Sequence, residues 1–237
     1  MIKNLATAML ALVFGFLGAA TWSYAGLADN RTRAFMLENP ELLPQMAEAY
    51  RTQENAQQLA TVRADVVKPF PGAFIGNPNG TKVLVEFADY NCTYCKQSLA
   101  DVQRLTEEDP ELKVIIREWS IFEGSEMAAR MALAAAMQGK YADFHYAMFR
   151  LGPATPETVE AAAVEAGLDM DRARADAVSD PVSVELARNM GLAQQLGVTG
   201  TPAWVTGQEV ISGAVGFDVL KTALEEAGAE ADHATGA

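Results

Sequence analysis

The feature that most constrains this chain is a strand-like run that leads directly to its only two cysteines. VLVEF, at residues 83–87, is a nearly continuous apolar run of strand length, which is typical of a strand covered on both faces. Cys92 and Cys95 follow within a few residues and are separated by two positions. Helix-favouring sequence occupies residues 92–106. We therefore expect both cysteines at the start of a helix that follows a buried strand.

The spacing of the cysteines favours chemistry over a structural cross-link. A disulfide stabilises a fold more when it closes a longer loop, and a bridge between residues three apart closes almost none. A structural zinc site needs four nitrogen or sulfur ligands, whereas this chain has two cysteines and two histidines, and His233 lies near the C-terminus. A redox pair is the favoured interpretation, and a copper(I) site made of two thiolates is the rival.

Helix geometry predicts different tasks for the two thiols. A thiol reacts as its thiolate, and the N-terminus of a helix stabilises negative charge through unpaired N–H groups and the helix dipole. Cys92 is therefore expected to be the exposed, attacking cysteine. Cys95 lies in the same turn and is expected to be the more buried cysteine, which resolves a mixed disulfide.

An acidic residue interrupts the apolar run VLVEF. Glu86 lies six residues before Cys92. An ionised carboxylate is unfavourable in a covered strand, so burial should raise the pKa of Glu86 until it can hold or pass a proton. We interpret Glu86 as the group that accepts the proton of Cys95. A glutamate at the end of a strand that reaches water is the alternative.

The sequence that follows predicts an α/β fold with a helical insertion. LKVIIRE, at residues 112–118, predicts a second buried strand, and residues 124–196 are rich in Ala, Met, Glu and Leu, which predicts an all-helical block. Residues 203–206 and 209–211 predict a two-stranded hairpin. A final helix over residues 216–227 and a flexible tail over residues 229–237 complete the chain. This order of elements indicates an α/β architecture.

The first 25 residues predict an export signal. They contain one charged residue, Lys3, and an apolar body over residues 5–20, and small residues at Ser23 and Ala25 favour cleavage after Ala25. The uncharged run is also long enough to serve as an uncleaved membrane anchor. Both interpretations place the rest of the chain outside the cytoplasm.

Residues 26–65 predict a polar, helical segment. Leu42, Met46 and Tyr50 recur at four-residue spacing and form one apolar stripe. This stripe either packs on the chain's own domain or mediates oligomerisation. Residues 66–82 are rich in proline and glycine, which predicts a linker and a domain boundary near residue 65.

The charge of the chain excludes one class of partner. It carries 31 acidic and 18 basic side chains, for a formal net charge of −13. An acidic surface repels the phosphates of nucleic acids and anionic lipid headgroups. We therefore expect no nucleic acid partner.

Two motifs together resemble the DsbA-like branch of the thioredoxin superfamily, thiol-disulfide oxidoreductases of the bacterial periplasm. These motifs are CTYC after VEFADYN, and TGTPAWV about a hundred residues later. The resemblance covers residues 66–228 and implies a thioredoxin fold with an inserted helical domain. It matches Cys92 to the nucleophile, Cys95 to the resolving cysteine, Glu86 to the buried acid and Pro202 to the cis-proline beside the active site. It implies that the Thr201-Pro202 bond is cis and holds an extended substrate segment.

FMLENPELLPQMAEAY, at residues 35–50, resembles the N-terminal extension of the suppressor-of-copper-sensitivity C proteins, which are DsbA-like. In some members this region trimerises the protein, and the assembly shuffles disulfides. The resemblance implies a homo-oligomer such as a trimer, and unfolded or misoxidised exported proteins as substrates. It also implies a membrane redox partner, with no cofactor and no metal.

Two departures from the DsbA pattern bear on the direction of the reaction. Tyr94 stands where the best-known oxidase of the family has a histidine, which puts strong oxidising power in doubt. Thr201 before the proline is more frequent in isomerase-type relatives. We interpret the protein as a disulfide isomerase or reductase. The alternatives are a DsbA-type dithiol oxidase and a non-catalytic copper(I)-binding chaperone.

Overall fold

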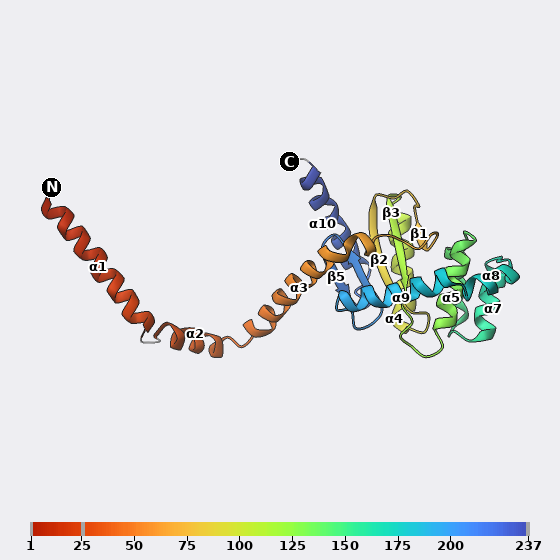
Figure 1. Ribbon diagram of the computed structural model, residues 1–237, viewed down its shortest axis with the longest axis horizontal. Coiled ribbons are helices and arrows are strands. Elements are labelled where there is room, and N and C mark those ends of the chain that lie inside the picture. Colours follow the sequence, from red (N-terminus) through yellow and green to blue (C-terminus); the bar gives the residue numbers. More distant parts are fainter. Residues whose placement is uncertain (1, 25–26, 236–237) are drawn as a thin grey trace. The chain divides into compact units, whose positions relative to one another are not determined.

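The structure is a computed structural model that describes residues 2–24 and 27–235. The chain divides into two compact units, Met1–Arg51 and Thr52–Ala237 (Figure 1). The second unit therefore begins upstream of the boundary predicted near residue 65. The reason is that Leu59, Val62 and Val66 are buried in the hydrophobic core of the second unit.

The first unit is helical, as the sequence predicts. It contains α1 (Ile2–Tyr24), α2 (Leu27–Glu38) and the first part of α3 (Leu42–Val66). The predicted cleavage site after Ala25 lies outside the described residues. Across residues 2–24 and 27–235, none of the helices combines the length and the apolar composition needed to span a lipid bilayer. Several large apolar side chains of α2 and α3 are exposed, among them Phe35, Leu37, Leu43 and Met46.

The second unit is built around a five-stranded sheet with the order β1-β3-β2-β4-β5. Its strands are β1 (Phe74–Gly76), β2 (Lys82–Ala88), β3 (Leu112–Glu118), β4 (Ala203–Thr206) and β5 (Glu209–Ser212). β2 and β3 are parallel, and the remaining pairs are antiparallel. The apolar run VLVEF thus forms the central strand β2, which explains why it has little alternation.

Helices surround this sheet, and five of them form the predicted insertion between β3 and β4. α4 (Thr93–Glu108) connects β2 to β3. The block between β3 and β4 contains α5 (Glu126–Met137), α6 (Tyr141–Leu151), α7 (Pro156–Glu165), α8 (Met170–Ala177) and α9 (Asp180–Gln195). The last helix, α10 (Phe217–Thr235), extends past the predicted end at residue 227, so the predicted flexible tail is helical as far as Thr235. The expected α/β architecture with a helical insertion is confirmed.

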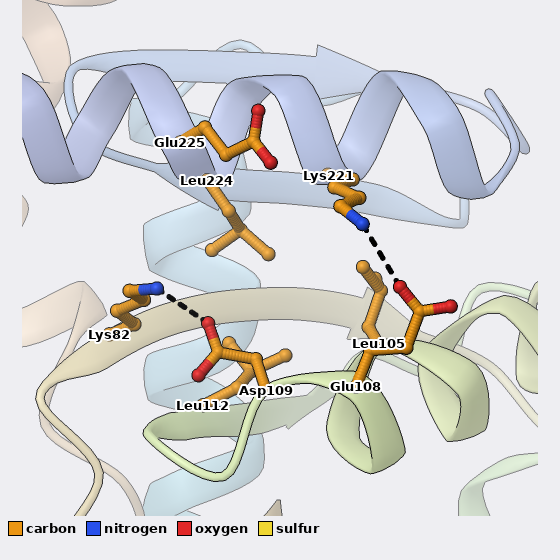
Figure 2. Close-up of a pocket in the computed structure, with 8 residues that line it drawn as sticks. All are labelled: Lys82, Leu105, Glu108, Asp109, Leu112, Lys221, Leu224 and Glu225. Carbon is orange, nitrogen blue, oxygen red and sulfur yellow. Dashed lines mark hydrogen bonds and ion pairs between the residues drawn. The ribbon is translucent and has the colours of Figure 1, made fainter.

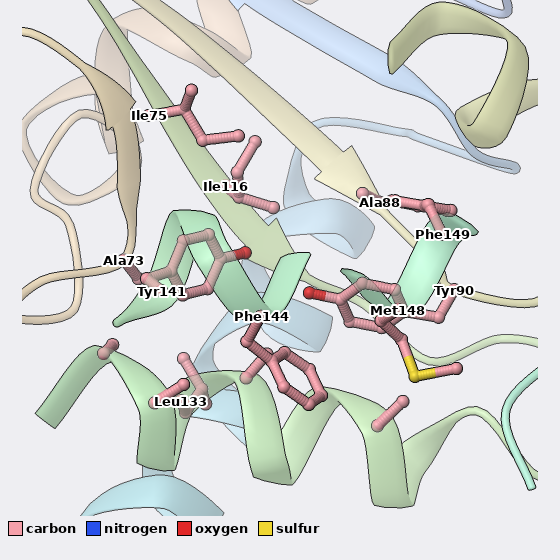
Figure 3. Close-up of a cluster of buried hydrophobic side chains, with 14 of the residues drawn as sticks. Ala73, Ile75, Ala88, Tyr90, Ile116, Leu133, Tyr141, Phe144, Met148 and Phe149 are labelled. Carbon is pink, nitrogen blue, oxygen red and sulfur yellow. The ribbon is translucent and has the colours of Figure 1, made fainter. Parts of the chain in front are cut away.

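The two faces of the sheet support two hydrophobic cores. Leu84 and Ala88 of β2 lie in the larger core, which also contains both cysteines and much of the helical insertion. Figure 3 shows part of this core, in which Phe144 and Met148 of α6 pack near Leu133 of α5. Side chains alternate along a strand, so Val85 and Phe87 face the other core, formed with α3 and the end of α9. The cysteines therefore share one face of the sheet with the insertion.

A buried arginine links the end of α3 to β3 and α9 within the second unit. Arg117 of β3 is fully buried and donates hydrogen bonds to the backbone carbonyls of Asp65 and Val66. Its guanidinium also pairs with Glu185 of α9 at 2.6 Å and donates to Asn189 at 3.1 Å. These bonds hold α3, β3 and α9 together on the face opposite the cysteines.

Candidate active site

The two cysteines lie where the sequence predicts, at the start of the helix that follows the central strand. Cys92 is the N-cap residue of α4, and Cys95 lies in its first turn. The backbone N–H of Cys92 donates to the carbonyl oxygen of Asp89 at 3.1 Å, which turns the chain from β2 into the helix. Both cysteines are free thiols. Cys92 thus lies at the N-terminus of α4, where the N–H groups of the first turn have no partner within the helix.

The second motif meets the first through the pairing of β2 with β4. Phe87 is paired with Ala203, so the residues that precede β4 lie beside the end of β2. The Thr201-Pro202 peptide bond is cis. The Cys92 thiol donates a hydrogen bond to the carbonyl oxygen of Thr201 at 3.1 Å, across 109 positions of sequence. The structure therefore brings Cys92, Thr201 and Pro202 together.

Both thiols are buried, which corrects the prediction that Cys92 is exposed. The exposed fraction is 3% for Cys92 and 1% for Cys95. Cys92 packs in the core and is hydrogen-bonded to Thr201, so little of its sulfur reaches solvent. Tyr94, between the two cysteines, is 62% exposed and marks the solvent side of this turn.

Glu86 lies inside the sheet and does not reach water. Its exposed fraction is 3%, and it stands in the ladder between Ile116 of β3 and Trp204 of β4. Burial raises the pKa of the Glu86 carboxyl well above its ordinary value, and the charges of Glu118 and Cys92 raise it further. Burial therefore favours the protonated form of this carboxyl.

The environment of Cys95 opposes its ionisation. Burial raises the pKa of the Cys95 thiol far above its ordinary value, and the charge of Glu86 adds to this effect. The backbone of Asp89 and the hydroxyl of Thr201 act in the opposite direction. Among the described residues, the buried Thr201 hydroxyl has no hydrogen-bond partner of ordinary geometry. It is thus free to donate to a Cys95 thiolate once one forms.

Asp89 is a site residue that the sequence analysis missed. Its carboxylate is buried and accepts four hydrogen bonds, and three of these come from the segment after β3. The donors are Asn91 N at 2.7 Å, Ile121 N at 2.7 Å, Phe122 N at 3.0 Å and Ser125 Oγ at 2.7 Å. The available signal was an aspartate directly after a buried strand, because an Asp side chain in a turn often accepts a hydrogen bond from the backbone N–H two positions later. Asp89 fixes the loop that carries Cys92.

A second missed residue, Glu118, ends β3 in a buried polar cluster. Its Oε1 accepts hydrogen bonds from the hydroxyls of Tyr90, at 3.0 Å, and Tyr141, at 2.5 Å. Figure 3 shows these two tyrosines with their hydroxyls turned toward each other. The Tyr90 hydroxyl also contacts Nδ1 of His145 at 3.0 Å. Burial raises the pKa of Glu118 to about 8, although both tyrosine hydroxyls lower it.

His145 is a packed residue rather than an exposed one. Burial lowers its pKa to about 3, so the imidazole is neutral at physiological pH. Its Nδ1 lies within hydrogen-bonding distance of the Tyr90 hydroxyl in the core.

Within the described residues, no group of three or more His, Cys, Asp or Glu side chains is arranged to hold a metal ion.

The pocket drawn in Figure 2 lies away from the cysteines, at the C-terminal end of α4. It has a volume of about 320 Å³ and lies between α4, α10 and the start of β2. Two ion pairs cross it, Lys82 with Asp109 at 2.6 Å and Lys221 with Glu108 at 3.0 Å. Each lysine therefore already has a carboxylate partner, and Glu225 adds a further acidic side chain to the lining.

Solved structures of other proteins are similar to this chain. A thioredoxin-like oxidoreductase from Silicibacter pomeroyi DSS-3 is 40% identical, with a TM-score of 0.66 over 70% of this chain and 96% of its own. A linker-deletion mutant of ScsC from Proteus mirabilis is 26% identical, with a TM-score of 0.70 over 84% of this chain and 92% of its own.

Curated relatives match only in part. The Na(+)/H(+) antiporter NhaA 1 of Salinispora arenicola is 25% identical over 148 residues, which are 61% of this chain and 23% of the antiporter. The chain thus spans about a quarter of that relative's length. The family model described as the DSBA-like thioredoxin domain matches residues 83–225, which include both cysteines and the cis-proline. This chain therefore belongs to the DsbA-like thioredoxin family of thiol-disulfide oxidoreductases.

Proposed function

We propose that this protein acts in the periplasm and exchanges disulfides with exported proteins through Cys92 and Cys95, as an isomerase or reductase. One observation carries the proposal. The Cys92 thiol, at the N-terminus of α4, lies 3.1 Å from the carbonyl oxygen of Thr201 beside the cis-proline. This arrangement places a reactive sulfur next to backbone that an extended peptide can pair with.

The first step is attack by Cys92. Its thiolate, stabilised by the N-terminus of α4, attacks one sulfur of a substrate disulfide. The substrate S–S bond breaks, a mixed disulfide forms with Cys92, and the other substrate sulfur leaves as a thiolate. The sulfur must first exchange its hydrogen bond to Thr201 for contact with the substrate, because Cys92 is buried.

The second step decides between reduction and isomerisation. In reduction, the Cys95 thiol gives its proton to the ionised form of Glu86, and the Cys95 thiolate attacks Cys92. The Cys92–Cys95 disulfide forms and the substrate thiolate leaves, so the substrate gains two electrons and the protein loses two. In isomerisation, another substrate thiol attacks the mixed disulfide and Cys92 is released unchanged.

The high barrier to ionisation of Cys95 supports the isomerase interpretation. Burial and the Glu86 charge both raise the pKa of Cys95, which slows resolution and gives a substrate thiol time to attack. The Thr201 hydroxyl then stabilises the Cys95 thiolate when it forms. A membrane redox partner would keep Cys92 reduced between cycles.

The N-terminal helices support an oligomer such as a trimer. Leu37 and Leu43 are each more than two-thirds exposed, and Phe35 and Met46 are more than half exposed. Large apolar side chains gathered on a helical segment mark a surface for association. Copies of the segment that meet through these side chains would place several active sites on one assembly.

A trapping experiment tests the exchange chemistry. Cys95→Ala leaves the mixed disulfide unresolved, so substrate proteins should remain joined to Cys92 and be released by a reductant. Cys92→Ala is the matched control and should trap none. Absence of any trapped protein with Cys95→Ala would refute thiol-disulfide exchange and favour copper(I) binding, which titration of the reduced protein with copper(I) would then measure.

A further inference from the structure

Two buried carboxyl groups share the face of the sheet that carries the cysteines. In the parallel register of β2 and β3, Glu86 is paired with Ile116 and Ala88 with Glu118. Side chains two positions apart along a strand point the same way, so Glu86 and Glu118 face the same core. That core also contains both thiols. The exchange chemistry of Cys95 therefore takes place beside two carboxyls, of which the proposed mechanism uses one.

Glu118 is held by a chain of hydrogen bonds that reaches into the insertion. Tyr90, in the loop before Cys92, and Tyr141 of α6 both donate to its Oε1. Because His145 is neutral, its Nδ1–H can donate to Tyr90 while Tyr90 donates to Glu118. These donors stabilise the anionic form of Glu118 and fix its position at the end of β3.

We propose that Glu118 is a positioning residue for the exchange reaction, which acts on Glu86 through its charge and sets the pH at which Glu86 can accept the Cys95 proton. This inference rests on the proposed function. Two carboxylates in one buried site do not ionise independently, because the first negative charge opposes the second. Ionised Glu118 therefore keeps the proton on Glu86, and neutral Glu118 lets that proton leave more easily.

Several titratable groups lie around Glu86 and Glu118. The charge of Glu118 is among the causes that raise the pKa of Glu86, after burial itself. Burial raises the pKa of Glu118 to about 8, so its charge changes within an accessible pH range. The titratable groups that face the two carboxyls come from the loop after β2, from α4 and from α6, and are Asp89, Tyr90, Cys92, Cys95, Tyr141, His145 and Tyr146. On the opposite face of the sheet, Arg117 is paired with Glu185.

The test isolates the step in which Cys95 reacts. Reduced protein is mixed with excess oxidised glutathione, so that Cys92 attacks the glutathione disulfide and one glutathione thiolate leaves. Cys95 then loses its proton, attacks Cys92 and expels the second glutathione thiolate. Rapid acid quenching followed by mass measurement gives the rate at which the glutathione adduct of Cys92 disappears, at each pH from 6 to 10.

The expected result is a shift of this pH profile in Glu118→Gln. The midpoint should move down by about one pH unit, because loss of a neighbouring negative charge favours ionisation of Glu86. At a pH below the midpoint, the adduct should therefore resolve about tenfold faster than in the native protein. In the Glu86→Gln background, Glu118→Gln should cause no shift, since the group through which it acts is gone.

Two outcomes would overturn the inference. They are an unshifted profile in Glu118→Gln, and an equal shift with and without Glu86. If Glu118→Gln does not fold, Tyr141→Phe serves instead: it removes one donor, keeps Glu118 neutral to higher pH, and should shift the profile in the same direction. A native protein that forms neither a glutathione adduct nor a Cys92–Cys95 disulfide would refute the proposed function itself, which separates the two failures.

Discussion

The carboxylate of Asp89 accepts a hydrogen bond from the hydroxyl of Ser125 at 2.7 Å, which joins the loop before Cys92 to the N-cap residue of α5, the first helix of the insertion. The same carboxylate accepts two backbone N–H groups from the segment between them. The active-site loop and the insertion are thus positioned by one buried side chain.

Asp89→Ala should destabilise the fold strongly, because it leaves several buried donors without an acceptor. We expect the free energy of unfolding to fall by about 3 kcal/mol, at about 1–3 kcal/mol for a buried group left unsatisfied. Ser125→Ala removes a single donor and should cost about 1 kcal/mol. Urea unfolding followed by circular dichroism measures both values. Equal losses in the two variants would show that the backbone bonds to Asp89 contribute little.

Thr201→Val should slow resolution by Cys95 without blocking attack by Cys92. The hydroxyl that valine lacks is the one placed to donate to the Cys95 thiolate, and a hydrogen bond to a charged group contributes about 1.5–3 kcal/mol. The decay of the glutathione adduct should therefore slow at least about tenfold. Thr201→Ser keeps the hydroxyl and should stay close to the native rate. If serine and valine behave alike, the hydroxyl takes no part in this step.

Stability should depend on pH through the buried carboxyl of Glu118. Its pKa is about 8 in the folded protein, whereas an unfolded glutamate ionises near pH ~4.3. The folded state therefore retains a proton that the unfolded state loses, and this contribution to stability is complete below the unfolded pKa and declines as pH rises toward 8. Glu118→Gln removes the effect.

The corresponding measurement compares thermal unfolding of the native protein and Glu118→Gln at pH 5 and pH 8. The variant should gain stability relative to the native protein between these two values. Titrating groups that lie away from Glu118 are common to both proteins and cancel in the difference. A constant difference across this range would mean that Glu118 titrates as an exposed glutamate does.

Charges placed on exposed apolar side chains of α3 should disrupt the proposed assembly. Leu43→Glu combined with Met46→Glu puts two negative charges where apolar side chains would meet. Light scattering should report the mass of a single chain for this double variant and a multiple of it for the native protein. Gln45→Glu, which adds a charge next to these side chains, is the control. An unchanged mass in the double variant would place the association surface elsewhere.

Much of the architecture was predictable because the strongest local signals were reinforced by tertiary packing. The strand at residues 112–118 matches β3 residue for residue. The start of α4 followed from the cysteines themselves. The boundary near residue 65 was misplaced because Leu59 and Val62 sit among polar residues, and only the fold provides the core that buries them.

The site was predictable where one residue type carried its own signal, and not where partners came from distant segments. Glu86 stood out as a charge inside an apolar run. Glu118 ends a strand and carries no local signal, because its partners Tyr90 and Tyr141 are 28 and 23 positions away. The burial of Cys92 depends on its contact with Thr201, which no local pattern indicates.

Reactivation of scrambled ribonuclease by the reduced protein measures the proposed isomerase activity. We expect that the native protein restores ribonuclease activity, that Cys92→Ala restores none, and that the Leu43→Glu, Met46→Glu variant loses most of the activity. Absence of reactivation by the native protein, or equal reactivation by Cys92→Ala, would contradict an isomerase that acts through Cys92. The first of these results would favour an oxidase, and the second would assign the reaction to something other than this thiol.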